Sequence, residues 1–175
     1  MDDFYKILHP KLAVLVATVD EKGKPNVMTC AWCTPVSEEP PTVAIAVWKG
    51  AYTNQVIKKT KEFTVNVPTA DLLDKVWLAG TKSGKKVDKV SLLKLTMESG
   101  KKVKAPVIGE CAAHLECKLV KSLDVGECTL FVGEVLAAYA DEELFKKGTW
   151  NLKKAKLPLH MGGKSFAIAE KTVKP

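Results

Sequence analysis

Residues 26–37 read Asn-Val-Met-Thr-Cys-Ala-Trp-Cys-Thr-Pro-Val-Ser, and they are the most informative part of the chain. Small and bulky side chains alternate along it, as in a β-strand, and its hydroxyl groups suit the docking of a flat ligand. Residues 12–19 before it and 42–48 after it are apolar strand candidates, and 20–25 are typical of a turn. The chain is therefore predicted to open with three strands joined by turns.

Further strands are expected later in the chain. Residues 62–67 alternate between apolar and polar side chains, as a half-buried strand does, and 111–120 repeats the pattern. Residues 129–139 form a longer apolar run in which Gly133 indicates a bulge or a barrel corner. With the first three strands, these runs predict a mainly β fold that closes, or nearly closes, into a barrel and so hides its edges.

Two short helices are expected between the strands. Residues 54–60 have an apolar side, and Thr53 before them is a suitable N-cap. Thr69 can cap a second helix that runs through Ala79, and Gly80 supplies its stop. The fold class is therefore mainly β with inserted helices.

The size of the chain favours one domain over residues 1–175. Its 175 residues, 46% of them hydrophobic, are enough to bury a substantial core. The start, Met1-Asp2-Asp3-Phe4, lacks the basic and apolar regions of a secretion signal, and no apolar run is long enough to cross a bilayer. A cytoplasmic protein without membrane contact is expected.

The charge pattern argues against specific nucleic-acid recognition. The formal charge is +7, and all 27 basic residues are lysine. Lysine lacks the rigid fork with which arginine reads guanine or clamps phosphate. The lysines lie in short groups, including Ser-Gly-Lys-Lys-Val at 83–87 and 99–103, which we interpret as polar loops. A basic barrel that binds nucleic acid through its aromatic residues stays a remote alternative.

Cysteine and histidine spacing indicates no disulfide and no metal site. Cys30 and Cys33 are three apart in the strand-like run, so their side chains should point to opposite faces, roughly 10 Å apart along the strand. Buried thiols in a reducing compartment are the simpler interpretation. His9, His114 and His160 have no metal-ligand spacing.

Four motifs, taken in order, connect the chain to a known family. They are Leu-Val-Ala-Thr-Val-Asp-Glu-Lys-Gly-Lys-Pro-Asn-Val-Met at 15–28, Thr-Pro-Val-Ser at 34–37, Glu-Phe-Thr-Val-Asn-Val-Pro at 62–68 and Leu-Phe-Val-Gly-Glu-Val at 130–135. Over nearly its whole length the chain resembles the flavin reductase-like family, which includes flavoredoxins and archaeal ferric reductases. The resemblance implies a Greek-key FMN-binding split β-barrel, a homodimer, and FMN held non-covalently near the subunit interface.

The resemblance also implies cofactor-binding residues. Family positions that line the flavin are matched by Asn26, Trp32, Thr53, Lys89 and Phe166. For the phosphate, Thr53 at a helix N-terminus offers a hydroxyl, backbone amides and the positive end of the helix dipole. Lys49 and Lys89 can add positive charge. Thr53 as a simple cap and Lys89 as a surface lysine remain alternatives.

The flat ring of the flavin would meet residues 26–37. Trp32 can supply an apolar wall, although it can equally belong to the barrel core. Backbone groups for the pyrimidine edge of the ring are offered by Thr29, Cys30, Ala31 and Cys33.

One departure from the family pattern affects the chemistry. Many members read Gly-Asp-His before the strand at 129–139, whereas this chain reads Gly126-Glu127-Cys128. A thiol does not replace imidazole as a cationic partner, which weakens the case for direct NAD(P)H oxidation but not for FMN binding. Cys128 and His160 are candidate groups near the flavin, and the catalytic residues are otherwise unassigned.

The function predicted is that of an FMN-dependent redox protein. As an NAD(P)H:flavin oxidoreductase, it would pass electrons from NADH or NADPH, or from a protein donor, through FMN to flavin, ferric or protein acceptors. The alternative is a flavoredoxin-type carrier that exchanges electrons with a redox partner protein and has no nicotinamide activity. The chain contains no Gly-x-Gly-x-x-Gly motif, so a separate nucleotide-binding domain is not expected.

Overall fold

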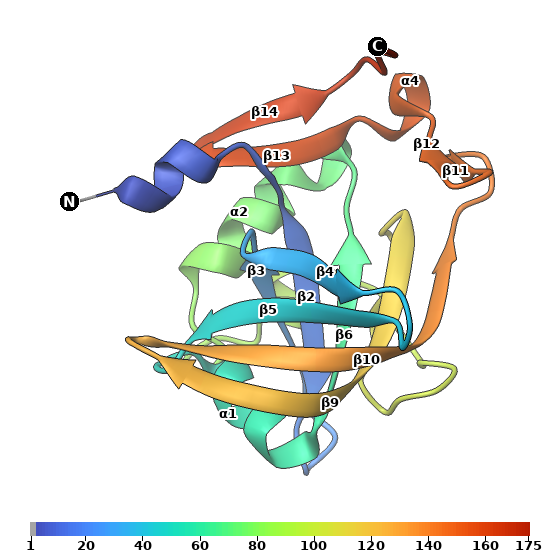
Figure 1. Ribbon diagram of the computed structural model, residues 1–175. Coiled ribbons are helices and arrows are strands. Elements are labelled where there is room, and N and C mark those ends of the chain that lie inside the picture. Colours follow the sequence, from blue (N-terminus) through green and yellow to red (C-terminus); the bar gives the residue numbers. More distant parts are fainter. Residues whose placement is uncertain (1–2) are drawn as a thin grey trace.

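Seven antiparallel strands form the main sheet of the computed structural model, which describes residues 3–175 (Figure 1). In spatial order they are β3 (Pro25–Cys30), β2 (Val14–Val19), β6 (Glu62–Val67), β9 (Ala113–Val125), β10 (Cys128–Ala140), β5 (Thr42–Trp48) and β4 (Cys33–Ser37). The edge strands β3 and β4 are consecutive in the chain, yet they are not hydrogen-bonded neighbours within the described sheet. The sheet therefore forms a barrel split along one seam, and the predicted mainly β split barrel is confirmed.

Three of the predicted strands have bounds close to those expected from their apolar or alternating patterns. β5 and β6 have the predicted bounds, and β10 extends its predicted range by one residue at each end. The register of β9 with β10 shifts between Val132 and Gly133, which confirms the predicted bulge. A Cβ at Gly133 would come within 2.7 Å of the buried Phe63 ring. Glycine at this position lets the core aromatic residue pack against the strand.

The stretch 26–37 is two strands, not one. β3 ends at Cys30, Ala31 and Trp32 make a bend, and β4 begins at Cys33. The prediction that Cys30 and Cys33 point to opposite faces was therefore wrong, since both thiols pack into the barrel core. Burial raises the pKa of Cys30 to about 12 and that of Cys33 to about 11, so both are neutral, unpaired thiols.

Helices cover one side of the barrel. α1 (Tyr52–Thr60) has Ala51 as its N-cap, so Thr53 lies inside the first turn, and its prediction as the cap was wrong. The second predicted helix begins as a short 3-10 helix (Ala70–Leu72), and α2 (Leu73–Thr81) continues through Gly80. A Cβ at Gly80 would lie 3.3 Å from Thr29, so this glycine lets α2 pack closely on β3. α3 (Lys89–Leu93) and α4 (Leu152–Ala155) follow.

A smaller sheet lies across one end of the barrel. The hairpin of β13 (Leu157–Gly162) and β14 (Ser165–Ala169) pairs with β1 (Lys11–Leu12), next to the N-terminal 3-10 helix η1 (Phe4–Leu8) (Figure 1). Two more short pairs are β7 (Met97–Glu98) with β8 (Val107–Ile108), and β11 (Phe145–Lys146) with β12 (Thr149–Trp150). Across residues 3–175, no helix combines the length and the apolar character needed to cross a membrane.

Candidate functional site

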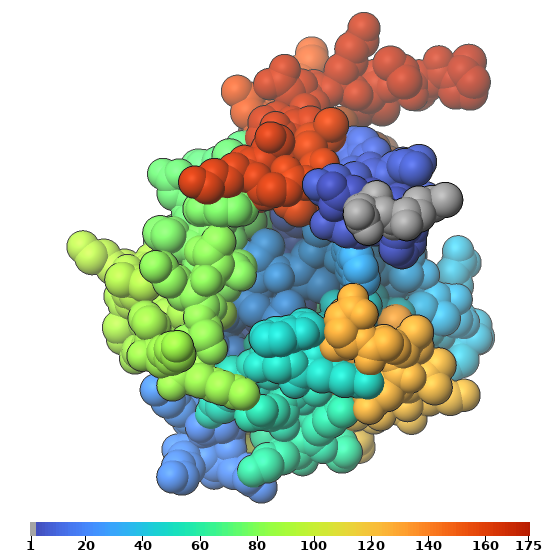
Figure 2. Space-filling model, turned by 90° about the vertical axis from the view of Figure 1, so that its left-hand side faces the viewer, coloured from blue at the N-terminus to red at the C-terminus, as the bar shows by residue number. Residues whose placement is uncertain are grey.

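A groove opens on the side of the barrel where β3 meets α2. Figure 2 shows this face as a hollow with early strand residues at its floor, α2 and the loop after it on one side, and the C-terminal hairpin above. Two adjoining clefts make up the groove, and they share Thr29, Gly80 and Thr81. Together they have the size of a typical small-molecule site.

The two clefts are named by one residue each. The Lys89 cleft has a volume of about 280 Å³ and is lined by Asn26, Met28, Thr29, Trp48, Gly50, Ala51, Tyr52, Thr53, Ala79, Gly80, Thr81, Lys82, Ser83, Gly84 and Lys89. The His160 cleft has a volume of about 360 Å³ and is lined by Thr29, Ala31, Val76, Trp77, Gly80, Thr81, His160, Gly163 and Phe166.

Lys89 is a buried cation at the inner end of the groove. Its side chain is 5% exposed, and Nζ donates a hydrogen bond to the main-chain oxygen of Ala79 over 2.8 Å. Within residues 3–175, no carboxylate forms an ion pair with it. Burial lowers the pKa of Lys89 to about 8. An ammonium group has three donors, so two are available to a ligand in the cleft.

The N-terminus of α1 faces the same cleft. Ala51 provides no side-chain cap, and Gly50, Ala51, Tyr52 and Thr53 all line the cleft. The first amides of a helix have no partner within the helix, and the dipole there attracts anions. Asn26 Nδ2 donates to Thr53 Oγ1 over 2.9 Å, so the hydroxyl hydrogen of Thr53 is free to bind a ligand oxygen. A buried lysine, a hydroxyl and uncapped amides are groups that suit an anion, and all of them lie at this end of the groove.

Two glycines shape the Lys89 cleft. A Cβ at Gly84 would collide with Asn26 and Tyr52, so only glycine lets the loop after α2 approach so closely. A Cβ at Gly50 would collide with the Trp48 ring, which lies against this backbone and is 60% exposed. The indole of Trp48 thereby forms a wall of the cleft.

The His160 cleft is aromatic. The rings of His160 and Phe166 lie 5.2 Å apart, and Trp77 faces the same space from α2. Lys164 Nζ is 5.8 Å from the centre of the Trp77 ring. Thr29, between the two clefts, donates its hydroxyl hydrogen to the main-chain oxygen of Val76 and so ties β3 to α2. This end of the groove suits a flat ring.

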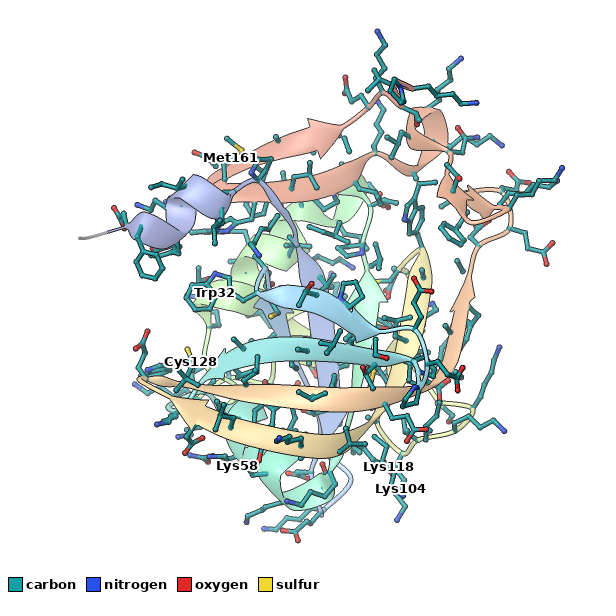
Figure 3. The ribbon with its side chains drawn as sticks, viewed as in Figure 1. Trp32, Lys58, Lys104, Lys118, Cys128 and Met161 are labelled. Carbon is teal, nitrogen blue, oxygen red and sulfur yellow. The ribbon has the colours of Figure 1, made fainter. Side chains whose placement is uncertain are left out.

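The structure brings many of the predicted residues together. Asn26, Thr29, Thr53 and Lys89 line the Lys89 cleft, whereas Thr29, Ala31, Phe166 and His160 line the other one. Cys128 is the register partner of Trp48 across β5 and β10, and it lies at the start of β10 on the groove side (Figure 3). Burial, then the Glu127 charge, raises the pKa of the Cys128 thiol.

Other predicted residues line neither cleft. The Cys30 thiol belongs to the barrel core. Trp32 packs against Tyr5, with ring centres 5.6 Å apart, and with Cys33 it lines a third, apolar hollow (Figure 3). Lys49 Nζ donates to the main-chain oxygen of Gly126 over 2.7 Å. Contact of these four with a flavin stays a prediction.

Several lining residues were missed by sequence reasoning. Ser83 and Gly84 belong to a run interpreted as a polar loop, although the Ser-Gly pair was itself a signal for a tight turn. Trp48 resembled a core strand residue, yet Gly50 two residues later indicates the close approach of its ring. His9 lines neither cleft but contacts His160, and it carried no sequence signal because this contact spans 151 residues.

The groove therefore suits an elongated ligand with an anionic group at one end and a flat ring at the other. FMN has this form: a phosphate, a polar ribityl chain and a planar ring with apolar faces. The groove offers matching residues in the same order along β3: Lys89 and Thr53 lie at the end suited to the phosphate, and His160 and Phe166 lie at the end suited to the ring.

Comparisons with known proteins agree with this geometry. A family model described as the flavin reductase like domain matches residues 8–166. A flavoredoxin structure from Methanosarcina acetivorans is 32% identical, covers 100% of this chain and 92% of its own, and has a TM-score of 0.88. An FMN-binding protein from Thermus thermophilus, with bound 1-cyclohex-2-enone, is 26% identical, covers 100% of this chain and 95% of its own, and has a TM-score of 0.89.

A relative with a named activity is also similar in sequence. An NADH-dependent FAD reductase from Streptomyces globisporus is 31% identical over 144 residues, which are 71% of this chain and 68% of the relative. The family match, over residues 8–166, includes the main sheet and the residues of both clefts. The chain belongs to the flavin reductase-like domain family.

Proposed function

We propose that this protein is an FMN-binding oxidoreductase that receives electrons from a reduced nicotinamide and passes them to flavin, ferric or protein acceptors. The observation that carries the proposal is Lys89, a buried ammonium group with a single main-chain partner at a cleft that also contains Thr53 and the uncapped start of α1. Bound FMN would supply the two-electron redox chemistry.

The residues of this chain would hold the cofactor by its ends. Lys89 Nζ and the Thr53 hydroxyl bind the phosphate, and Asn26 keeps the Thr53 oxygen in place through their 2.9 Å hydrogen bond. The ring end lies along the main chain of Thr29 and Ala31, next to Phe166 and His160. Trp48 and Tyr52 line the inner cleft on its aromatic side.

Two similarities support different electron donors. The likeness to an NADH-dependent FAD reductase favours NADH or NADPH as the donor. The likeness to a flavoredoxin, together with Cys128 in place of the histidine of the family pattern, favours a carrier that exchanges electrons with a redox partner protein. The carrier is therefore our second candidate. The five unpaired thiols suit a cytoplasmic location.

Visible absorption distinguishes these candidates. The purified protein is mixed with FMN, freed from excess, and treated with NADH or NADPH without oxygen. Retained flavin bands that bleach promptly support the reductase. Bands that persist until dithionite is added support the carrier, and a protein that retains no flavin bands contradicts FMN as a resident cofactor.

We also infer a homodimer formed through the outer face of the sheet. Neighbouring strands place two apolar rows there, Trp48, Cys128 and Val125, then Ala46, Leu130 and Leu123, and a third row in which Ala44 and Val132 adjoin Lys121. Val125 and Leu123 are more than half exposed, and a contiguous apolar patch of this kind is typical of an interface. Trp48 belongs both to this face and to the Lys89 cleft, so a second copy seated here would adjoin the site.

Light scattering tests the dimer. The wild type should have twice the 19.1 kDa mass of one chain, and Leu123→Glu should reduce this to one chain. Val173→Glu, at an exposed apolar position near the C-terminus, is the matched control and should leave the mass unchanged. A monomeric wild type contradicts the inference.

A further inference from the structure

His9 and His160 form a pair at the outer end of the groove. Their ring centres lie 5.1 Å apart, and His160 also packs against Phe166 in the cleft. His9 directly follows η1, whereas His160 lies on β13. The pair therefore joins the N-terminal segment to the C-terminal hairpin at the edge of the His160 cleft.

Two hydrogen bonds determine what each imidazole offers. His9 Nδ1 donates to the main-chain oxygen of His160 over 2.8 Å, and His160 Nε2 donates to the main-chain oxygen of Gly163 over 3.1 Å. A carbonyl oxygen only accepts, so both of these nitrogens carry hydrogen. Nδ1 of His160 is the nitrogen left for a ligand, as an acceptor when the ring is neutral and a donor when it is protonated.

His9 is held more firmly than a surface histidine. Its ring packs between His160 and Tyr5, and the Tyr5 ring centre is 6.0 Å away. Its Nε2 is buried and has no hydrogen-bond partner among residues 3–175. Burying that nitrogen costs free energy, so packing and the Nδ1 hydrogen bond, rather than contact with water, fix the ring.

Two lysine side chains lie near His160. The Lys6 side chain lies against Gly162, where a Cβ would be 3.4 Å from its methylene carbons, but its ammonium group is paired with Asp3 over 2.7 Å, and Lys164 lies over Trp77. No carboxylate among residues 3–175 pairs with either histidine. A hydrogen on Nδ1 of His160 therefore has no carboxylate to bind within these residues, and an electron-rich ring edge is a suitable acceptor for it.

Resting on the proposed function, we propose that His160 contacts the ring end of the bound flavin and exchanges a proton with it through Nδ1, and that His9 is the positioning residue of His160. A reduced nicotinamide, as hydride donor, brings two electrons and one proton, and full two-electron reduction needs one more proton. Protonated His160 would supply that proton from Nδ1, and the neutral imidazole left behind would accept it again when the flavin is reoxidised. Cys128, a neutral thiol, has no positive charge to contribute there.

Histidine NMR tests the contact directly. The chain has only three histidines, so single substitutions assign their ring signals. Saturating FMN, and riboflavin at high concentration, should shift the His160 and His9 signals by more than a linewidth. Inorganic phosphate should shift neither, and His114, in a separate network with Asn66, should not respond. If the protein retains the visible absorption bands of FMN but the His160 signals do not move, the role of His160 is wrong and the proposed function stands. If the protein retains no flavin bands, the proposed function itself is wrong.

Matched variants test the two roles. His160→Gln keeps a donor for Gly163 but has no Nδ1, so the FMN dissociation constant should stay within about twofold, because the phosphate contacts remain. Flavin reduction by NADH, or reoxidation of dithionite-reduced protein by free FMN, should slow by about 100-fold.

His9→Phe, which keeps a ring but loses the donor, should slow the same step and reduce the FMN-induced shift of His160. His9→Asn, which keeps the donor, should retain the rate of that step and the FMN-induced shift of His160. If His9→Phe and His9→Asn give the same rate and the same shift, His9 does not position His160.

Discussion

The ammonium nitrogen of Lys89 lies 2.8 Å from the main-chain oxygen of Ala79, in the last turn of α2. This single hydrogen bond holds a buried positive charge at the inner end of the groove, where the first amides of α1 also point. Burying a cation without a counter-ion costs free energy in the unliganded protein. An anionic ligand removes that cost, so the stability of the unliganded protein and its affinity for an anion both depend on Lys89.

Lys89→Met should weaken FMN binding by about 1 to 3 kcal/mol, because it removes a charge-assisted hydrogen bond to phosphate. The unliganded variant should unfold at the same denaturant concentration as the wild type or a higher one, because a buried cation is replaced by an apolar chain of similar length. Fluorescence titration and urea unfolding measure the two effects. Riboflavin, which lacks the phosphate, should bind both proteins equally.

The affinity for FMN should fall as the pH rises through about 8. Burial lowers the pKa of Lys89 in the free protein to about 8, and a bound phosphate favours the charged form and raises that pKa again. Binding near pH 8 should therefore take up protons, which calorimetry in buffers of different ionisation heat detects. The stability of the unliganded protein should change with pH in the opposite direction. Its free energy of unfolding is reduced below pH 8, where the buried Lys89 is charged, and it rises above pH 8 as Lys89 loses its proton. An affinity that does not change from pH 7 to 9 would contradict Lys89 as a phosphate ligand.

Thr53→Ala should also weaken FMN binding by about 1 to 3 kcal/mol, because the hydroxyl donor is lost. Asn26 would then lose its 2.9 Å partner as well. Thr53→Ser keeps the hydroxyl and is the matched control. If alanine and serine give equal dissociation constants, the hydroxyl of residue 53 does not bind the ligand.

Gly84→Ala should reduce FMN binding through shape rather than charge. The new Cβ would collide with Asn26 and Tyr52, so the loop after α2 has to move away from the cleft. Ser83→Ala, at the neighbouring position, adds no atoms and should bind FMN as the wild type does. Equilibrium dialysis compares the two variants, and equal retention of FMN would show that the loop has room to adjust.

Glu116→Gln should destabilise the fold by about 1.5 to 3 kcal/mol without changing FMN binding. This buried carboxylate accepts hydrogen bonds from the amides of Lys101, Lys102 and Val103 and from the Tyr139 hydroxyl. Burial alone would raise the pKa of Glu116, but these hydrogen bonds together hold it below its ordinary 4.5. The stabilisation is thus complete above pH 4.5 and is lost as the pH falls through the lowered pKa.

Glu62→Gln is the control for this prediction, because Glu62 anchors the same loop by one hydrogen bond, to the amide of Lys104. Thermal unfolding at pH 7 and pH 4 compares the two variants. If Glu62→Gln costs as much as Glu116→Gln, the set of donors around Glu116 is not what stabilises the loop.

The sequence predicted the strands that have a strong local pattern. β6 alternates between apolar and polar side chains, whereas β5 is an almost continuous apolar run, and both contribute residues to the barrel core. The bend at Ala31 and Trp32 was missed, because the segments on both sides of it have strand-like sequences. They become separate strands because β3 and β4 lie at opposite edges of the sheet, which is a property of the whole fold. The hairpin of β13 and β14 was missed because its residues are mostly half-buried and show no strong period.

The candidate site was predicted in part for a similar reason. Thr53 and Lys89 were identified through a family resemblance, and nothing in the local sequence distinguishes Lys89 from a solvated lysine. Its burial arises because the first turn of α3 packs against the end of α2, which is a tertiary contact. The contact of His9 with His160 spans 151 residues in the same way, and local patterns do not encode such contacts.

A crystal structure of the protein soaked with FMN would show whether Lys89 and Thr53 hold the phosphate. We expect one FMN per chain, with phosphate oxygens within hydrogen-bond distance of Lys89 Nζ and Thr53 Oγ1 and the ring between Thr29 and His160. A flavin bound elsewhere, for example in the apolar hollow beside Trp32, or one whose phosphate points away from Lys89, would contradict it.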